Sequence, residues 1–198
     1  MILIDIIGII AFAISGYIIA REHNLDLLGM FLISFSTALG GGIIRDTISD
    51  RVPFTFTECY PFIVVIIVIS ISYTFKIAKS SENTKIFLLA DNLGLVAFAI
   101  TGAITGVESN MNFIGVVLLS LITAIGGGVI RDILLNRVPT VLSSDFYGSV
   151  AVIIGVSIYI LEYFGLRNDT STNILFICGI IIRIMAIKWE WKLPTIKY

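Results

Sequence analysis

The sequence predicts an all-α integral membrane protein with seven transmembrane helices, arranged as two inverted three-helix repeats plus a seventh helix. The chain has 198 residues, of which 57% are hydrophobic and only 14% are charged. A soluble domain averages about 25% charged residues. The mean hydropathy is +1.01. The chain also contains seven apolar stretches, and the first six recur as two related sets of three.

Each apolar stretch is near the ~20 residues needed to cross ~30 Å of hydrocarbon, so each is a predicted span. The first span begins with Asp5 rather than with basic residues and has no clear cleavage site, so we do not expect a signal peptide. We interpret 1–198 as one transmembrane domain, with repeat one at about 2–80, repeat two at about 86–165 and the seventh helix at about 173–189. The predicted spans are 2–20, 25–48, 61–75, 86–107, 113–135, 147–164 and 173–189.

The repeat appears when the chain is shifted by 86 residues, which aligns Asp5 with Asp91 and Arg45 with Arg131. The match needs no gap from Asp5 to Pro53, and 24 of those 49 positions are identical. Each copy contains three spans, an odd number, so we expect the second copy to enter the membrane the other way up. Inverted repeats of this kind are typical of channels and secondary transporters.

Basic residues predict the orientation, because cytoplasmic loops carry an excess of Lys and Arg. Arg45 and Arg131 are set aside because we do not expect them in loops. Arg51 and Arg167 fall on the side opposite the C-terminus. We therefore predict a multi-pass protein of the cell membrane with its N-terminus outside and its C-terminus in the cytoplasm. The side of the C-terminus collects Arg21, Lys76, Lys79, Lys85, Arg137, Lys188, Lys192 and Lys197.

A motif of three glycines followed by Arg-Asp occurs once in each repeat, as ALGGGIIRD at 38–46 and AIGGGVIRD at 124–132. Three glycines inside a helix cost about 1 kcal/mol each relative to alanine. We therefore predict broken helices at 40–42, in the outer half of the membrane, and at 126–128, in the inner half. The charged residues just beyond the breaks would flank a constriction. The candidate residues are Gly40, Gly41, Gly42, Arg45, Asp46, Gly126, Gly127, Gly128, Arg131 and Asp132.

A second interpretation of the glycines is close helix packing, as in GxxxG motifs, with the Arg-Asp pairs as interfacial anchors. For the arginines we favour a bracing role, in which Asp46 and Asp132 neutralise Arg45 and Arg131. The carbonyl oxygens freed at the glycines would then face the ion path.

Other polar residues near the motif have two interpretations each. Asp5 and Asp91 could attract cations to the two mouths, or they could be interfacial residues or helix N-caps. Four hydroxyl residues on the approach to the glycines could offer oxygens to an ion, or could bond back to their own helix. These four are Ser34, Thr37, Ser120 and Thr123.

Metal, cofactor and enzymatic chemistry find little support in the sequence. His23 stands alone, and Cys59 and Cys178 are expected to be buried and reduced. The chain contains no HExxH, GxSxG or carboxylate cluster, so we expect no catalysis, no metal site and no cofactor. We also expect no nucleic-acid partner.

The doubled GGG-x-x-RD motif resembles the signature of the trimeric intracellular cation (TRIC) channel family, in its prokaryotic branch. The resemblance covers essentially the whole chain. It implies homotrimers in the lipid bilayer, in which each subunit holds an hourglass pore lined by the second and fifth helices, bent at the glycines. It also implies permeation by monovalent cations, favouring potassium, and makes a bound phospholipid a candidate ligand. Animal relatives bind a phosphoinositide through a basic residue on the fourth helix, but no Lys or Arg occurs at 86–107.

The main rival function is small-solute transport. Some prokaryotic relatives are assigned to glycine uptake, and a zwitterion would suit paired Arg and Asp groups. An inverted repeat fits both functions. Liposome flux separates them, because a channel carries current from potassium alone whereas a carrier saturates with glycine.

Overall fold

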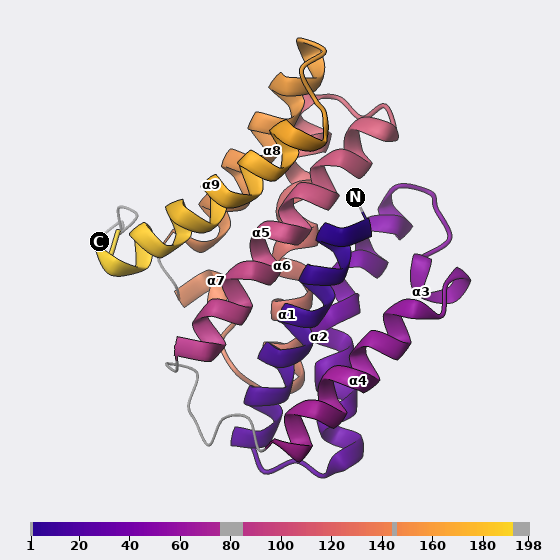
Figure 1. The fold of residues 1–198 in the computed structure, drawn as a ribbon, viewed down its shortest axis with the longest axis vertical. Helices are drawn as coiled ribbons and strands as arrows, with labels where there is room; N and C mark the ends of the chain where they lie inside the picture. Colours follow the sequence, from indigo (N-terminus) through magenta and orange to yellow (C-terminus); the bar gives the residue numbers. More distant parts are fainter. Residues whose placement is uncertain (1, 76–84, 144–145, 192–198) are drawn as a thin grey trace.

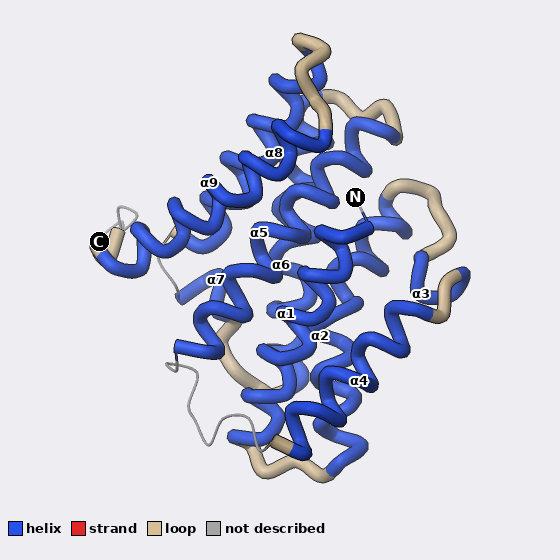
Figure 2. Tube along the Cα trace, in the orientation of Figure 1, coloured by secondary structure: helices blue, strands red, loops and turns tan. Residues whose placement is uncertain are grey.

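The structure is a computed structural model that describes residues 2–75, 85–143 and 146–191. All regular structure in these parts of the chain is helical (Figures 1 and 2). Each of the seven predicted spans coincides with a helix whose ends lie within a few residues of the predicted ones. The helices are α1 (Ile2–Glu22), α2 (Leu27–Ile48), α3 (Phe54–Thr57), α4 (Tyr60–Thr74), α5 (Lys85–Glu108), α6 (Phe113–Leu134), α7 (Thr140–Ser143), α8 (Tyr147–Tyr163) and α9 (Asp169–Lys188).

Five of these helices (α1, α2, α5, α6 and α9) are long and apolar enough to cross a membrane. Helices α4 and α8 are equally apolar but shorter, at 15 and 17 residues. The four-residue helices α3 and α7 were not predicted, and they occupy equivalent positions after α2 and α6. Four lysines used in the orientation prediction lie outside the described residues: Lys76, Lys79, Lys192 and Lys197.

Matching signals at the helix ends explain why the two repeats fold alike. Asp26 caps α2 by accepting a hydrogen bond from Gly29 N at 2.7 Å, and Asn112 caps α6 by accepting one from Gly115 N at 2.8 Å. A side-chain acceptor at this position satisfies an amide that the helix leaves unpaired. The reversals before α2 and after α2 also have equivalents around α6. They use left-handed Asn24 and Asp50, and then Asn110 and Asn136.

The central helices are α1, α2, α5 and α6, which pack on one another. Helix α4 packs on α1 and α2, whereas α8 packs on α5 and α6 and α9 packs on α5 and α8. Helices α4 and α9 therefore lie on opposite flanks of the central bundle (Figure 1). One buried core belongs mainly to the first repeat, around Phe12 and Leu39, and another mainly to the second, around Leu95 and Ile154.

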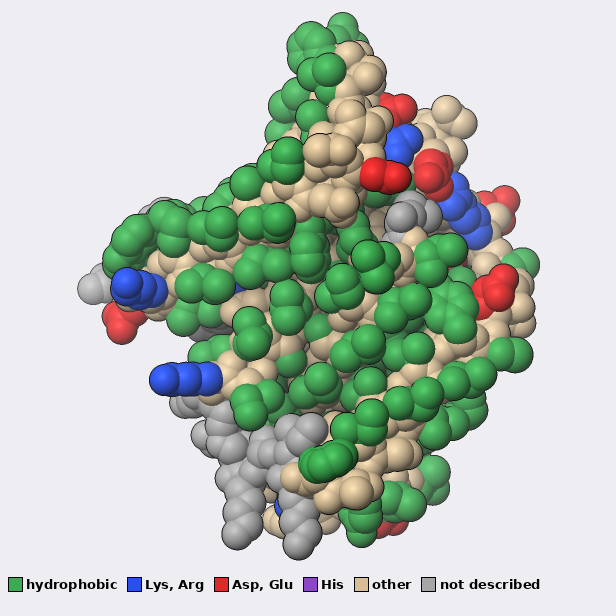
Figure 3. All heavy atoms as spheres, in the orientation of Figure 1, with side chains coloured by type: hydrophobic (Ala, Val, Ile, Leu, Met, Phe, Trp, Pro, Cys, Tyr) green, Lys and Arg blue, Asp and Glu red, His purple; other side chains and the backbone are tan. Residues whose placement is uncertain are grey.

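Apolar side chains cover much of the outside, which is the reverse of a soluble fold. Figure 3 shows hydrophobic side chains over most of one face, with charged groups near its periphery. Ile67 on α4 and Ile181 on α9 are about half exposed. Cys59 and Cys178 are exposed, so the prediction that they are buried is wrong, and both side chains lie on this outer surface.

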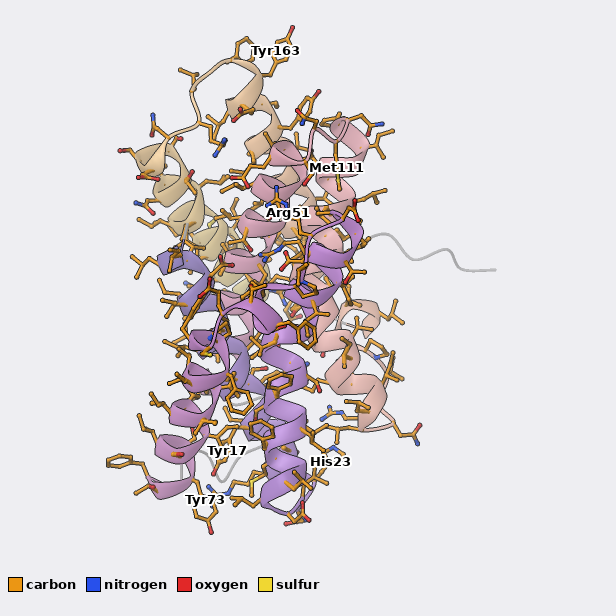
Figure 4. The ribbon with its side chains drawn as sticks, turned by 90° about the vertical axis from the view of Figure 1, so that its right-hand side faces the viewer. Tyr17, His23, Arg51, Tyr73, Met111 and Tyr163 are labelled. Carbon is orange, nitrogen blue, oxygen red and sulfur yellow. The ribbon has the colours of Figure 1, made fainter. Side chains whose placement is uncertain are left out.

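The two ends of the molecule are distinct (Figure 4). His23 and Tyr73 lie at one end, and Met111 and Tyr163 lie at the other. The predicted topology places the first two residues on the cytoplasmic side and the last two outside.

Candidate functional site

The two glycine triplets meet where α2 crosses α6. A Cβ atom added to Gly41 would overlap the carbonyl oxygen of Thr123, and one added to Gly127 would overlap that of Thr37. These two contacts are equivalent under the 86-residue repeat. Glycine is therefore required here by backbone-to-backbone approach between helices, as in small-residue motifs of membrane proteins.

This geometry corrects the prediction of broken helices. Residues 40–42 and 126–128 keep helical conformation within α2 and α6. The triplets also touch each other instead of lying in opposite halves of the membrane, since the Cα atom of Gly41 lies 3.2 Å from an ideal Cβ on Gly126. Because residues 40–42 and 126–128 are equivalent under the repeat and touch each other, they lie where the two repeats meet. The backbones of α2 and α6 are in contact at the glycines, which leaves no room there for carbonyl groups turned away from their helix. The interpretation of the glycines as a close-packing motif therefore describes this structure.

The four hydroxyl residues near the glycines are fully buried and already donate hydrogen bonds. Thr37 and Thr123 donate at 2.6 Å to the carbonyl oxygens four residues earlier, and Ser34 does the same at 2.7 Å. Ser120 differs, because its hydroxyl lies 2.9 Å from the carbonyl oxygens of both Ala99 and Ala151. The back-bonding interpretation therefore holds for three of the four.

The first arginine cluster consists of Arg45, Asp46, Asp5, Thr101 and the Phe54 amide. Arg45 Nε donates to Asp46 Oδ1 at 2.7 Å, and Arg45 Nη1 lies 3.4 Å from Asp5 Oδ1. The same nitrogen donates to Thr101 Oγ1 at 3.2 Å. Asp46 Oδ2 accepts from the Phe54 backbone N–H at 3.0 Å, which ties α2 to α3.

The second arginine cluster consists of Arg131, Asp132, Asp91, Ser15 and Thr140. Arg131 Nε donates to Asp132 Oδ1, and Nη1 to Asp91 Oδ1, both at 2.9 Å. Arg131 Nη1 also donates to Ser15 Oγ at 2.6 Å. Asp132 Oδ2 accepts from the Thr140 amide at 2.8 Å, which ties α6 to α7.

The two clusters exchange residues between repeats. Thr101 of the second repeat contacts the arginine of the first, and Ser15 of the first repeat contacts the arginine of the second. Ser15 and Thr101 are themselves 86 residues apart. Each arginine site is therefore complete only when both repeats are folded together.

Asp5 and Asp91 are ion-pair partners and not helix caps. Both lie within their helices, α1 and α5, and are mostly buried. Burying a carboxylate is costly unless it is paired. Asp5 on α1 pairs with Arg45 on α2, and Asp91 on α5 pairs with Arg131 on α6. The mouth-attraction role of these residues remains a prediction.

A similar exchange joins the ends of the repeats. Arg51 lies 3.3 Å from Glu108 near one end of the bundle, with both side chains more than one third exposed. At the equivalent pair, burial lowers the pKa of the Arg137 guanidinium, while the charge of the Glu22 carboxylate raises it.

The second arginine cluster has neighbours that sequence reasoning did not single out. Tyr147 of α8 donates its hydroxyl to Asp91 Oδ2 at 2.6 Å. Arg183 of α9 stacks on the Tyr147 ring, with its guanidinium carbon 4.8 Å from the ring centre, and donates to Asn92 Oδ1 at 2.8 Å. Ser15 and Thr101 were also missed. The repeat pairs them, and Arg183 is the one charged residue between Asp169 and Lys188, which is an available signal for an intramembrane role.

Comparisons with known proteins agree on one family. A family model described as Glycine transporter matches residues 2–78 and 88–163, once per repeat. The UPF0126 membrane protein YvgT of Bacillus subtilis is 35% identical over 194 residues, 98% of this chain and 95% of that protein. The UPF0126 inner membrane protein YadS of Escherichia coli is 30% identical over 97% of this chain and 94% of that protein.

Solved structures match over the same extent. A structure from work on conductance through TRIC cation channels superposes with a TM-score of 0.88 and 38% identity, covering 100% of this chain and 98% of that one. The TRIC channel orthologue from Rhodobacter sphaeroides superposes with a TM-score of 0.88 and 27% identity, covering 96% and 97%.

The helical fold, the close crossing of α2 and α6 and the apolar exterior define a multi-pass helical membrane protein. Within that class, the chain belongs to the family that unites the UPF0126 membrane proteins with the prokaryotic TRIC channels. The resemblance predicted from the doubled motif is confirmed.

Proposed function

We propose that this chain is a potassium-permeable channel for monovalent cations, with one hourglass pore in each subunit of a homotrimer. The observation that carries the proposal is full-length similarity to TRIC cation channels together with the doubled arginine cluster. The pore is lined by α2 and α6, with its constriction at the Gly41–Gly127 crossing. The solved relatives are channels, which also supports a function without catalysis.

Under this proposal the seven apolar helices all cross the bilayer, with the N-terminus outside, and the two repeats are inverted. Helices α4 and α8 are short for a full span, so they would rely on local thinning of the bilayer or on oligomerisation. The two arginine clusters then lie on opposite sides of the constriction. The arginines brace α2 and α6, because a bare guanidinium beside the path would repel potassium whereas a paired one repels it much less.

The backbone contact between the glycine triplets leaves no passage between them in this conformation. We therefore infer that the constriction is closed here and that conduction requires α2 and α6 to separate or rotate. Lipids cover the apolar exterior, and a bound phospholipid remains a candidate ligand.

Glycine transport is the second candidate, favoured by the description of the matching family model. The test is reconstitution of the purified protein in planar bilayers and liposomes. The channel proposal predicts unitary potassium currents that exceed chloride currents and do not depend on glycine. Saturable glycine uptake without such currents would establish the carrier instead.

Topology is tested with native Cys59 in a Cys178→Ser protein. An impermeant thiol reagent should label Cys59 only from outside, and His23→Cys in a protein lacking both native cysteines only from the cytoplasm. Labelling of both from one side would contradict the inverted repeat. The trimer is tested by the mass of the protein in detergent, where a monomeric mass would contradict it.

A further inference from the structure

Phe12 and Phe98 form an aromatic pair at the contact between α1 and α5. These two helices pack on each other in the middle of the bundle (Figure 1). Both side chains are fully buried, and their ring centres lie 5.4 Å apart with the ring planes inclined by 44°. The two positions are 86 residues apart, so they are equivalent under the repeat. The aromatic pair therefore lies where the two repeats meet, as the glycine triplets do.

Each ring packs on a glycine of the opposite helix. A Cβ atom added to Gly94 would lie 2.2 Å from the Phe12 ring, and one added to Gly8 would lie 3.4 Å from the Phe98 ring. Gly8 and Gly94 are also equivalent under the repeat. The Phe12 ring occupies the space that a side chain at position 94 would need, so glycine there lets the ring lie directly on the backbone of α5.

The Phe12 ring also borders the glycine crossing. Its Cδ2 atom lies 3.5 Å from an ideal Cβ on Gly127, and the Thr37 carbonyl oxygen lies 2.0 Å from that same Cβ. The ring and the backbone of α2 are therefore neighbours on one side of α6. Ala38 and Leu39, which precede the first glycine triplet, belong to the same buried cluster as both rings. A space opened between α2 and α6 at the crossing would be bordered by the Phe12 ring.

We propose that Phe12 is the hydrophobic gate residue of the pore, and that Phe98 holds the Phe12 ring in its closed position. This inference rests on the proposed channel function, in which the constriction lies at the Gly41–Gly127 crossing and opens when α2 and α6 separate or rotate. Narrow hydrophobic constrictions stop ions by excluding water. A gap beside the phenyl ring therefore stays dry until the ring turns away from the crossing.

The contacts of the ring favour the closed state. An aromatic pair with this tilted geometry shifts an equilibrium by about two- to tenfold. A movement that turns Phe12 away from the crossing breaks its contacts with Phe98 and Gly94. Removal of either ring should therefore raise the open probability, and the effect should be larger for Phe12 because its ring also borders Gly127.

The test compares single-channel potassium currents of wild type, Phe12→Ala, Phe12→Leu, Phe98→Leu and Ile154→Ala. Ile154 on α8 is the control, because it is 1% exposed and its truncation also leaves a cavity in a buried core. Phe12→Ala should raise the open probability about two- to tenfold. Phe12→Leu and Phe98→Leu should raise it by less, and Ile154→Ala should leave it near wild type.

Two results would overturn the gate. One is an unchanged or lower open probability in both Phe12 variants, and the other is an equal rise in Ile154→Ala. If Phe12→Ala does not assemble, Phe12→Leu decides the question, since it keeps most of the side-chain volume and removes the ring. A wild type and variants that all carry no current would contradict the proposed channel function, whereas a conducting wild type with unaltered Phe12 variants would contradict the gate alone.

A stability cycle tests the position of the ring without any current. Melting temperatures in detergent are compared for wild type, Gly94→Ala, Phe12→Ala and the double variant. The three atoms nearest to a Cβ at position 94 all belong to the Phe12 ring. Gly94→Ala should therefore lower the melting temperature much less in the Phe12→Ala background than in wild type. Equal losses in both backgrounds would show that the ring does not lie on α5, and the gate would be overturned even if the channel conducts.

Discussion

The two arginine clusters use the same motif, yet they differ in burial and in the length of the arginine-to-aspartate contact. The side chains of Arg131 and Asp91 are 1% and 3% exposed, against 7% and 11% for Arg45 and Asp5. The arginine-to-aspartate distance across helices is 2.9 Å in the second cluster and 3.4 Å in the first. Tyr147 also donates a hydrogen bond to Asp91 in the second cluster, so two copies of one sequence motif have become sites that differ in burial and in contacts. The repeat accounts for the shared arginines, and α8, which lies outside the four central helices, accounts for the added contact.

The largest effect is expected at the crossing that both clusters share. Gly127→Ala or Gly41→Ala would place a methyl group on a backbone oxygen of the other helix, which neither helix can avoid without moving. We expect a loss of about 3 kcal/mol or more in the free energy of unfolding, or failure to assemble. Gly128→Ala is the matched control, since its nearest neighbours are 3.7 and 3.9 Å away, and it should be tolerated. Denaturant unfolding in detergent measures the stability of each variant. Equal stability of Gly127→Ala and Gly128→Ala would show that the crossing does not require glycine.

Removing each arginine measures the difference between the clusters. Arg131→Met leaves two buried carboxylates without a guanidinium and should cost about 3–5 kcal/mol, as broken buried pairs do. Arg45→Met should cost less, because the first cluster is more exposed. Arg131→Lys keeps the charge but loses the planar fork, so it should recover stability only in part. Chemical denaturation ranks the three, and a larger loss for Arg45→Met than for Arg131→Met would reverse the comparison.

Tyr147→Phe removes a hydroxyl that donates to the second cluster. Asp91 would lose one of its donors while the ring under Arg183 stays, so we expect a loss of about 1–3 kcal/mol. Tyr163→Phe is the control, because that side chain is 77% exposed and should change stability little. Thermal unfolding of the two variants makes the comparison, and equal losses would mean that the hydroxyl contributes nothing specific.

The smallest effects should be equal in the two repeats. Asp26→Ala and Asn112→Ala each remove one N-cap hydrogen bond of similar length, and each should cost about 0.5–2 kcal/mol. Asp26→Ser keeps a capping oxygen and should lose little. Melting temperatures that fall by very different amounts for the two alanine variants would show that the repeats differ beyond their arginine clusters.

The doubled motif allowed much of this architecture to be predicted from sequence. The positions of the seven apolar helices could be predicted because hydropathy reports them directly, and the family could be predicted from the doubled motif. The pairing of each arginine with the aspartate that follows it was proposed from the adjacency of the two residues, and the structure has both pairs. The helix breaks at 40–42 and 126–128 were predicted wrongly. Glycine weakens an isolated helix, but here the crossing helix closes on it and the backbone stays helical.

Contacts between distant helices could not be predicted in the same way. Asp5 and Asp91 were expected at mouths or caps because nothing local in the sequence shows which helix an intramembrane carboxylate faces. Arg183 was visible as a lone charge in the seventh span, but its contact with Tyr147 depends on how α9 packs on α5 and α8. The roles of the hydroxyl residues in ion passage remain predictions.

The bracing role of the arginines is tested most directly by the potassium current through Arg45→Gln, reconstituted beside wild type and the exposed control Arg51→Gln. Asp5 would lose its guanidinium partner and take up a proton, so the net charge of the first cluster would change little. The account predicts a less stable protein whose folded fraction keeps its unitary potassium current and its preference over chloride within about twofold. A well-folded Arg45→Gln protein with an about tenfold larger cation current would show that Arg45 is an electrostatic barrier, and the bracing account would be wrong.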